Sequence, residues 1–345
     1  MILKYIESNA SPKKCTSIYY IQMHNKTQNP KRKKKRNSKT RKEKYQHIAN
    51  QLQHISLNSI TKEYFKLQTT SCAEAKKASN RIRLGNKIVD AFTFVERLHT
   101  KGHQNVSFYE FWENRKYYKQ KKYIQKMLTF YENRDIDEIR KFKYIYNLYF
   151  SSITIFRPIM AMEIYCKVNA TRVLDFTMGW GGRLVGACAL GLEAYIGIDN
   201  NIHLREPYKK LCSFLESETE SDRKTTIDLR FTDALTVDYS KMDYDCVFTS
   251  PPYYDLETYG DSDDKVYASK EDWNKKFYAP LFTKTFHALK PGGSYCLNIP
   301  DYIYEAVCLP LFGRYSQKIS LKKGERKLGE RKNEYREFIY IWFRP

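Results

Sequence analysis

The chain lacks the features that mark membrane, secreted and metal-binding proteins. Its 345 residues contain no apolar run long enough to cross a bilayer, and the N-terminus has no compact apolar segment with a small-residue cleavage site. Its 8 cysteines stand singly, without the Cys-x-x-Cys pair of a zinc knuckle or a redox couple. We therefore expect an intracellular protein, cytoplasmic or, in a eukaryotic host, nuclear, with reduced thiols, no bound metal and no membrane partner.

What the chain does contain is enough apolar material for a core, and a very uneven charge. Hydrophobic residues make up 42% of the sequence, which argues against wholesale disorder. The net charge is +21, and residues 1–170 hold 35 Lys and Arg against 13 Asp and Glu, whereas residues 171–345 hold 25 against 26. This asymmetry indicates a polyanion-binding part joined to a part with another task.

Residues 1–60 show no sustained apolar period and are expected to form a basic, disordered tail. Between residues 31 and 44 stand ten basic residues and one acidic residue, and such a run repels itself when it is free. The run could be a nucleic-acid tether or a nuclear-import signal, or it could be a solvated tail with no partner. The pattern leaves these interpretations open.

Residues 61–150 favour a helical accessory region that binds nucleic acid. Apolar residues recur at helical spacing in residues 87–98, and aromatic residues are interleaved with lysine and arginine in residues 108–131. Rings among basic residues could stack on nucleotide bases. They could equally be core residues whose basic neighbours face water, and both interpretations stay open.

Residues 151–345 predict an α/β domain with a Rossmann-like, doubly wound sheet, because strands and helices alternate along them. Helices are expected at Arg183–Leu190, capped by Gly191, and at Trp273–Leu289. The seven expected strands are Val173–Phe176, Ala194–Asp199, Ile227–Phe231, Cys246–Ser250, Ser294–Ile299, Ser316–Leu321 and Phe338–Ile341.

A first candidate site follows the first of these strands. Gly179 and Gly181 lack side chains, so the backbone can approach a ligand closely at the start of a helix. Asp199 ends the second strand, where an acid receives ribose hydroxyls, and Asp233 follows the third, where it could accept a hydrogen bond from an adenine amine. A nicotinamide fingerprint would need glycine where Leu184 stands, so another nucleoside cofactor is indicated.

A second candidate site is the segment Ser250-Pro251-Pro252-Tyr253 at the end of the fourth strand. Two prolines stiffen the backbone, so the Ser250 hydroxyl and the Pro251 carbonyl become fixed acceptors for both protons of a planar NH₂ group. Tyr253 supplies a ring to stack on the base that carries this amine. Acceptors that pull on the N–H bonds free the nitrogen lone pair, which can then attack a positioned methyl group without a covalent protein nucleophile.

These residues resemble the S-adenosylmethionine-dependent amino-methyltransferases of DNA, over the region from about residue 151 to the end. The catalytic motif of that family, (Asp/Asn/Ser)-Pro-Pro-(Tyr/Phe), is matched by Ser250–Tyr253. Its first motif, commonly Asp-Pro-Phe-x-Gly-x-Gly, is similar to Asp175-Phe-Thr-Met-Gly179-Trp180-Gly181, although Phe176 and Thr177 replace the usual Pro-Phe. Phe156-Arg-Pro158 is similar to the motif that closes over the methionine end of the cofactor.

The resemblance implies a class I methyltransferase fold whose last strand is antiparallel, and S-adenosyl-L-methionine as cofactor. It places Phe156, Asp175, Gly179, Trp180, Gly181, Asp199 and Asp233 at the cofactor. It implies methyl transfer to an exocyclic amine of a flipped DNA base, with cytosine N4 slightly favoured over adenine N6 because serine opens the catalytic motif. An RNA base-amine methyltransferase and an inactive nucleic-acid-binding protein on the same fold are the alternatives. Target recognition falls to the basic half, to residues 254–273 or to the repeated Gly-Glu-Arg-Lys stretch at residues 324–332.

Overall fold

The computed structural model describes the chain from Thr40 onward in seven ranges, which are residues 40–78, 82–102, 104–150, 153–254, 257–258, 267–320 and 337–345. Most of the basic run, the Gly-Glu-Arg-Lys stretch and much of residues 254–273 lie outside these ranges. Within the described ranges, no helix combines the length and the hydropathy of a membrane span.

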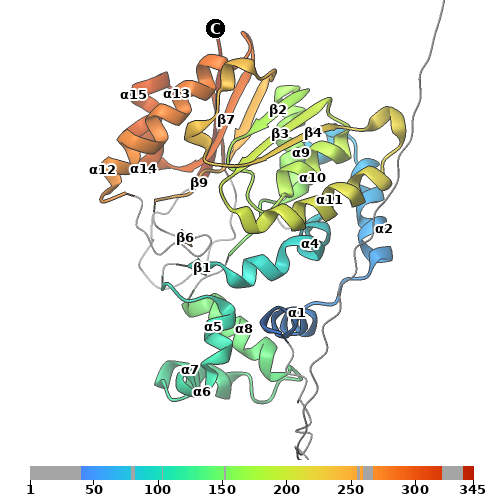
Figure 1. The fold of residues 1–345 in the computed structure, drawn as a ribbon, viewed down its shortest axis with the longest axis vertical. Coiled ribbons are helices and arrows are strands. Elements are labelled where there is room, and N and C mark those ends of the chain that lie inside the picture. Colours follow the sequence, from blue (N-terminus) through green and yellow to red (C-terminus); the bar gives the residue numbers. More distant parts are fainter. Residues whose placement is uncertain are drawn as a thin grey trace, which may run out of the picture. The chain divides into compact units, whose positions relative to one another are not determined.

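A seven-stranded sheet forms the centre of the C-terminal half (Figure 1). Its order is β4-β3-β2-β5-β7-β9-β8, with β4, β3, β2, β5 and β7 parallel and β9 antiparallel to both β7 and β8. This arrangement confirms the predicted Rossmann-like sheet and its antiparallel last strand. The strands are β2 (Arg172–Asp175), β3 (Ala194–Asp199), β4 (Thr226–Phe231), β5 (Cys246–Thr249), β7 (Ser294–Pro300), β8 (Gln317–Ser320) and β9 (Glu337–Phe343).

Helices cover both faces of this sheet because neighbouring strand residues point to opposite sides. Val173 of β2 packs into the core under one group of helices, and the next residue, Leu174, packs into the core under the other. Figure 1 shows the first group, α9 (Pro158–Val168), α10 (Gly182–Leu190) and α11 (Arg205–Ser217). The second group comprises α12 (Lys270–Trp273), the π-helical η5 (Asn274–Tyr278), α13 (Ala279–Ala288), α14 (Asp301–Ile303), the π-helical η6 (Tyr304–Cys308) and α15 (Leu309–Phe312).

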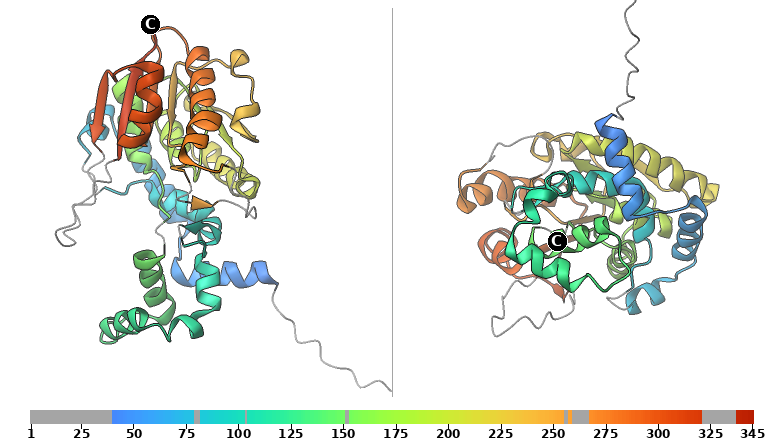
Figure 2. Two further views of the ribbon diagram at one scale, coloured as in Figure 1. Left: turned by 90° about the vertical axis from the view of Figure 1, so that its left-hand side faces the viewer. Right: turned by 90° about the horizontal axis from the view of Figure 1, so that it is seen from below.

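The N-terminal part is helical, as predicted, but its helices divide between two cores. They are α1 (Arg41–Leu52), α2 (Leu57–Gln68), α3 (Cys72–Lys77), α4 (Asn86–His99), α5 (Phe108–Glu113), α6 (Arg115–Tyr118), α7 (Lys122–Phe130) and α8 (Glu138–Tyr149). Buried residues of α2, α3 and the first half of α4 pack with α9 and α10 against the sheet. Those of α1, the end of α4, α5, α7 and α8 form a separate aromatic core, whose helices are drawn in blue for α1 and in teal and green for α4, α5, α7 and α8 in Figure 2.

The expected tail of residues 1–60 needs a correction, because α1 begins at Arg41 and α2 at Leu57. The Thr40 side chain accepts a hydrogen bond from the Glu43 backbone, and the Glu43 carboxylate accepts one from the Thr40 backbone at 2.8 Å. This capping box starts the helix. Tyr45 and Ala49 are then buried one turn apart. The dense lysines and arginines around them hid this apolar spacing in the sequence.

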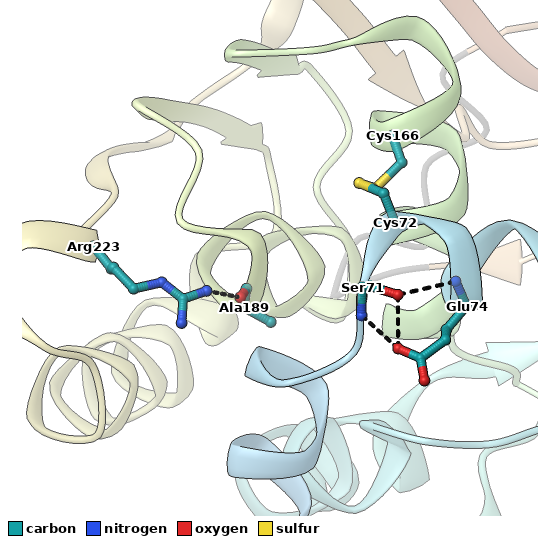
Figure 3. Close-up of a disulfide and its surroundings, with 6 residues drawn as sticks. All are labelled: Ser71, Cys72, Glu74, Cys166, Ala189 and Arg223. Carbon is teal, nitrogen blue, oxygen red and sulfur yellow. Dashed lines mark hydrogen bonds between the residues drawn. A yellow bond between two sulfur atoms is a disulfide. The ribbon is translucent and has the colours of Figure 1, made fainter.

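A disulfide joins Cys72 of α3 to Cys166 of α9, so the expectation of eight reduced thiols is wrong for this pair. The two residues are 94 positions apart in the sequence, a separation from which no spacing rule predicts pairing. Figure 3 shows the bond beside the N-terminus of α3, where the Ser71 side chain and the Glu74 carboxylate cap the helix. The disulfide fixes one of the N-terminal helices to the layer that covers the sheet.

Candidate active site

The loop after β2 has the shape that its glycines predicted. Gly179 and Gly181 adopt φ values of +56° and +90°, in the left-handed region that side chains disfavour, and Gly181 caps the N-terminus of α10. A Cβ atom on the next residue, Gly182, would lie 1.8 Å from the carbonyl oxygen of Phe156. The absence of side chains here therefore serves both the turn and the close packing of residues 156–158 on α10.

Asp199 and Tyr208 hold this loop from the neighbouring elements. The Asp199 carboxylate accepts hydrogen bonds at 2.9 Å from the backbone N–H groups of Gly179 and Asn201. The Tyr208 hydroxyl of α11 donates to the carbonyl oxygens of Met178 and Gly179, at 3.2 and 3.0 Å. Each carboxylate oxygen of Asp199 accepts one of these hydrogen bonds and has a lone pair left to accept another.

Asp175 is engaged more completely than a cofactor contact would be. Its oxygens accept hydrogen bonds from Arg183 at 2.6 and 3.0 Å, from the Tyr195 hydroxyl at 2.6 Å and from the Thr249 hydroxyl at 2.8 Å. These four bonds use the acceptor sites of a carboxylate, and the side chain is fully buried. Asp175 therefore ties β2 to β3, β5 and α10, and we assign it a positioning role in place of the expected cofactor contact.

Two further residues expected at the cofactor, Phe156 and Trp180, lie around the same loop, whereas Asp233 follows β4. The Phe156 ring packs edge-on against Phe248 with centroids 5.3 Å apart, and the Arg183 guanidinium lies 5.6 Å from its centre. Trp180 is buried within the loop itself. Asp233 is exposed after β4 and caps a short 3₁₀ turn by accepting a hydrogen bond from the Leu235 N–H at 2.9 Å.

The second candidate site lies directly beside the first. The hydroxyls of Thr177, in the glycine loop, and Thr249, immediately before Ser250, are 2.5 Å apart. Both loops follow the carboxyl ends of adjacent parallel strands, which is where α/β sheets bind ligands. The structure thus brings together the two motifs that the sequence presented separately.

Ser250 and Tyr253 belong to a hydrogen-bonded cluster with two residues that sequence reasoning missed, Asn298 of β7 and Glu337 of β9. The hydroxyls of Ser250 and Tyr253 lie 3.0 Å apart. The Asn298 amide nitrogen lies within 3.0 Å of both hydroxyls and 2.6 Å from a Glu337 carboxylate oxygen. The Tyr253 hydroxyl also lies 3.0 Å from that carboxylate oxygen. No motif marked Asn298 or Glu337, because their relation to Ser250 arises only from the pairing of β5, β7 and β9.

Asn298 also carries an unused acceptor. Its side chain is 2% exposed, and its Oδ1 atom has no hydrogen-bond partner among the described residues. A buried acceptor without a donor costs free energy, so such atoms often mark a ligand position.

The proline segment is held by Tyr278 of η5. The Tyr278 hydroxyl donates to the Pro252 carbonyl oxygen and accepts from the backbone N–H of Tyr254 at 3.1 Å. Tyr254 has a φ of +56°, which is strained for an aromatic residue. Among the described residues no donor bonds the carbonyl oxygen of Pro251. The role of Ser250 and Pro251 as an acceptor pair stays a prediction, and the support of this segment by Tyr278 had no signal in the sequence.

Comparison with known proteins supplies no family for this chain. No family model matches the chain, and no curated protein sequence matches it. Solved structures with a similar fold include TrmN from Thermus thermophilus, at 14% identity and TM-score 0.36 over 55% of this chain and 49% of TrmN, so that about half of TrmN is spanned. An rRNA methylase from Streptococcus thermophilus matches 56% of this chain and 99% of its own, at 16% identity and TM-score 0.34. SMU.1697c from Streptococcus mutans, solved in complex with SAH, matches 55% of this chain and 99% of its own, at 14% identity and TM-score 0.35. The argument for function rests on the site.

Proposed function

We propose that this protein is an S-adenosylmethionine-dependent methyltransferase that modifies an exocyclic amine of a nucleic-acid base. The observation that carries the proposal is the contact between Thr177 of the glycine loop and Thr249, the residue that leads into the Ser250–Tyr253 segment, with their hydroxyls 2.5 Å apart. A nucleoside-cofactor loop and an amine-accepting segment at adjacent strand ends are the parts that such a transfer needs.

The residues present fit this cofactor. The loop at Gly179 leaves room for close backbone approach next to a helix N-terminus, since a Cβ atom there would meet no atom nearer than 3.9 Å. Asp199 has acceptor capacity for ribose hydroxyls, and Asp233 is exposed beyond the neighbouring strand. The bound cofactor would supply an electrophilic methyl group on a sulfonium centre.

The chain's own residues orient the amine and receive its proton. The Ser250 hydroxyl and the Pro251 carbonyl accept the two N–H bonds of the target amine, and the Tyr253 ring stacks on its base. Asn298 fixes the Ser250 and Tyr253 hydroxyls. The proton that leaves the methylated nitrogen has a hydrogen-bonded route from Ser250 through the Tyr253 hydroxyl to the Glu337 carboxylate, in two steps of 3.0 Å.

DNA is the substrate that we propose, with cytosine N4 ahead of adenine N6 and with RNA as the alternative. The base must leave its stack to reach a site at the end of a strand.

The test is incubation with methyl-labelled S-adenosylmethionine and either unmethylated DNA or total RNA, followed by counting of the label in each polymer. Label in DNA is expected. Label in RNA alone would replace DNA by RNA, and label in neither, with the cofactor shown to bind, would favour the inactive-scaffold alternative.

Cofactor affinity should fall as the pH drops below about 6. Burial raises the pKa of Asp199 to about 6, although the backbone N–H groups of Asn201 and Gly179 oppose this shift. Above that pH the ionised carboxylate accepts ribose hydroxyls, and below it protonation removes acceptor capacity. Calorimetric titration of S-adenosylmethionine between pH 5 and 8 measures the effect. Asp199→Asn should give weak binding that is flat with pH, whereas Asp238→Asn, at an exposed acid that caps a 3₁₀ turn, should keep the wild-type profile. A flat wild-type profile would contradict the role of Asp199.

A further inference from the structure

The aromatic residues of the α5–α8 region divide into two sets. Those of α5 and the inner face of α8 are core residues, because Phe108, Tyr109, Phe111, Phe142 and Tyr146 are almost completely buried. A second set of rings, on α6, α7 and α8, is between 36% and 57% exposed. It comprises Tyr117, Tyr123, Phe130, Tyr144 and Tyr149. The two interpretations of this region that the sequence left open therefore apply to different residues.

Most of the exposed rings meet across one seam, where α7 packs beside α8. Tyr123 contacts Tyr149 with ring centroids 4.9 Å apart, and further along the helices Tyr131 contacts Tyr144 at 5.8 Å. Phe130 adjoins Tyr131 at 5.1 Å. We call these five rings the aromatic seam. They form two groups of contacting rings, Tyr123 with Tyr149 and Phe130 with Tyr131 and Tyr144, on the two helices that Figure 2 shows in teal and green.

Basic side chains alternate with the rings of the seam. On α7, Tyr123, Lys126 and Phe130 stand at positions i, i+3 and i+7, so they share one face. The Arg134 guanidinium lies 4.4 Å from the centre of the Phe130 ring. Residues 115–126 contain six basic residues and no acidic residue, and both Lys122 and Lys126 are exposed.

We propose that the aromatic seam is a binding surface for unpaired nucleotides, with bases stacked on its rings and phosphates held by Lys122, Lys126 and Arg134. Exposed rings interleaved with cations are the arrangement that single-strand binders use, because every base has a flat face and every linkage has a negative charge. A lipid surface would require a wholly apolar face, whereas rings and basic side chains alternate along the aromatic seam. The inference rests on the proposed function, since it describes how the protein holds the strand that carries a flipped or unpaired target base.

The test compares binding of a labelled oligothymidylate, an oligouridylate and a duplex of the same length, by fluorescence anisotropy on the full chain without cofactor. The double variant Tyr123→Leu/Tyr144→Leu keeps apolar cover but removes two stacking faces. Its affinity for both single strands should fall about tenfold or more, with much less change for the duplex. Phe65→Leu is the matched control, because Phe65 of α2 is 66% exposed and lies outside the seam; it should bind as the wild type does.

A second variant tests the charge. Lys126→Gln should reduce the slope of log affinity against log salt for single strands by about 0.7, the change expected for the loss of one phosphate contact.

Equal affinity of wild type and double variant, or equal loss in the Phe65→Leu control, would overturn the proposal, and so would a loss confined to the duplex. The methyl-labelling assay of the proposed function, run separately, distinguishes the two failures. Binding that depends on the seam, without any methylation, would contradict the proposed function alone, whereas methylation with binding that does not depend on the seam would contradict the seam alone.

Discussion

Replacing Arg183 by methionine should lower the free energy of unfolding by about 3–5 kcal/mol, because it leaves the buried Asp175 carboxylate without its cation. Both side chains are almost completely buried, at 4% and 0% exposed. Although burial disfavours the charged guanidinium, Asp175 raises the pKa of Arg183 above its usual value. Urea unfolding followed by circular dichroism measures the change.

The matched control for this prediction is Arg172, which lies on β2 together with Asp175. Arg172 pairs with Glu193 and Asp243 on the surface, where exposed ion pairs contribute little, so Arg172→Met should cost much less. The double variant Asp175→Asn/Arg183→Met should recover part of the loss, since no unpaired charge remains. Similar losses in Arg183→Met and Arg172→Met would show that the Asp175 network does not organise the site.

Tyr253→Phe should reduce the rate constant of methyl transfer about 100-fold, with nucleic-acid affinity almost unchanged. The substitution keeps the ring that stacks on the base but removes the hydroxyl that links Ser250 to Glu337 at 3.0 Å on each side. Tyr253→Ala removes the ring as well and should abolish transfer. Single-turnover assays on labelled substrate, with anisotropy for binding, separate the two effects.

A control tyrosine is available for this series. Tyr315 packs against Tyr340 and is not part of the Ser250 cluster, so Tyr315→Phe should transfer methyl groups at the wild-type rate. Full activity of Tyr253→Phe would remove the proposed proton route through its hydroxyl. Full activity of Tyr253→Ala would show that the base pocket lies elsewhere.

The elements that the sequence predicted are those whose signals are local. All seven strands of the large sheet were located to within two residues, because buried strands such as β3 (Ala194–Asp199) read as short apolar runs between turns. Gly191 was expected to cap α10 and does so in the left-handed conformation. The two motif loops were recognised because glycine permits a left-handed backbone and proline fixes φ, and both effects act within a few residues.

The features that escaped prediction depend on contacts between distant segments. The hydrogen-bond partners of Asp175 come from β3, β5 and α10. Its positioning role therefore becomes visible only once these elements pack together in the fold. Asn298 and Glu337 reach Ser250 only through strand pairing. The Cys72–Cys166 bond spans 94 positions. Local patterns carry no information on any of these contacts.

The position of the methyl group on the product nucleoside tests the central claim most directly. The account predicts that mass spectrometry of digested, enzymatically methylated nucleic acid will find the new methyl on an exocyclic nitrogen, as N4-methylcytosine or N6-methyladenine. The reason is that Ser250 and Pro251 are acceptors for an amine and the Ser250–Tyr253 segment contains no cysteine to attack a ring carbon. A methyl group found instead on cytosine C5 or on a ribose oxygen would contradict it.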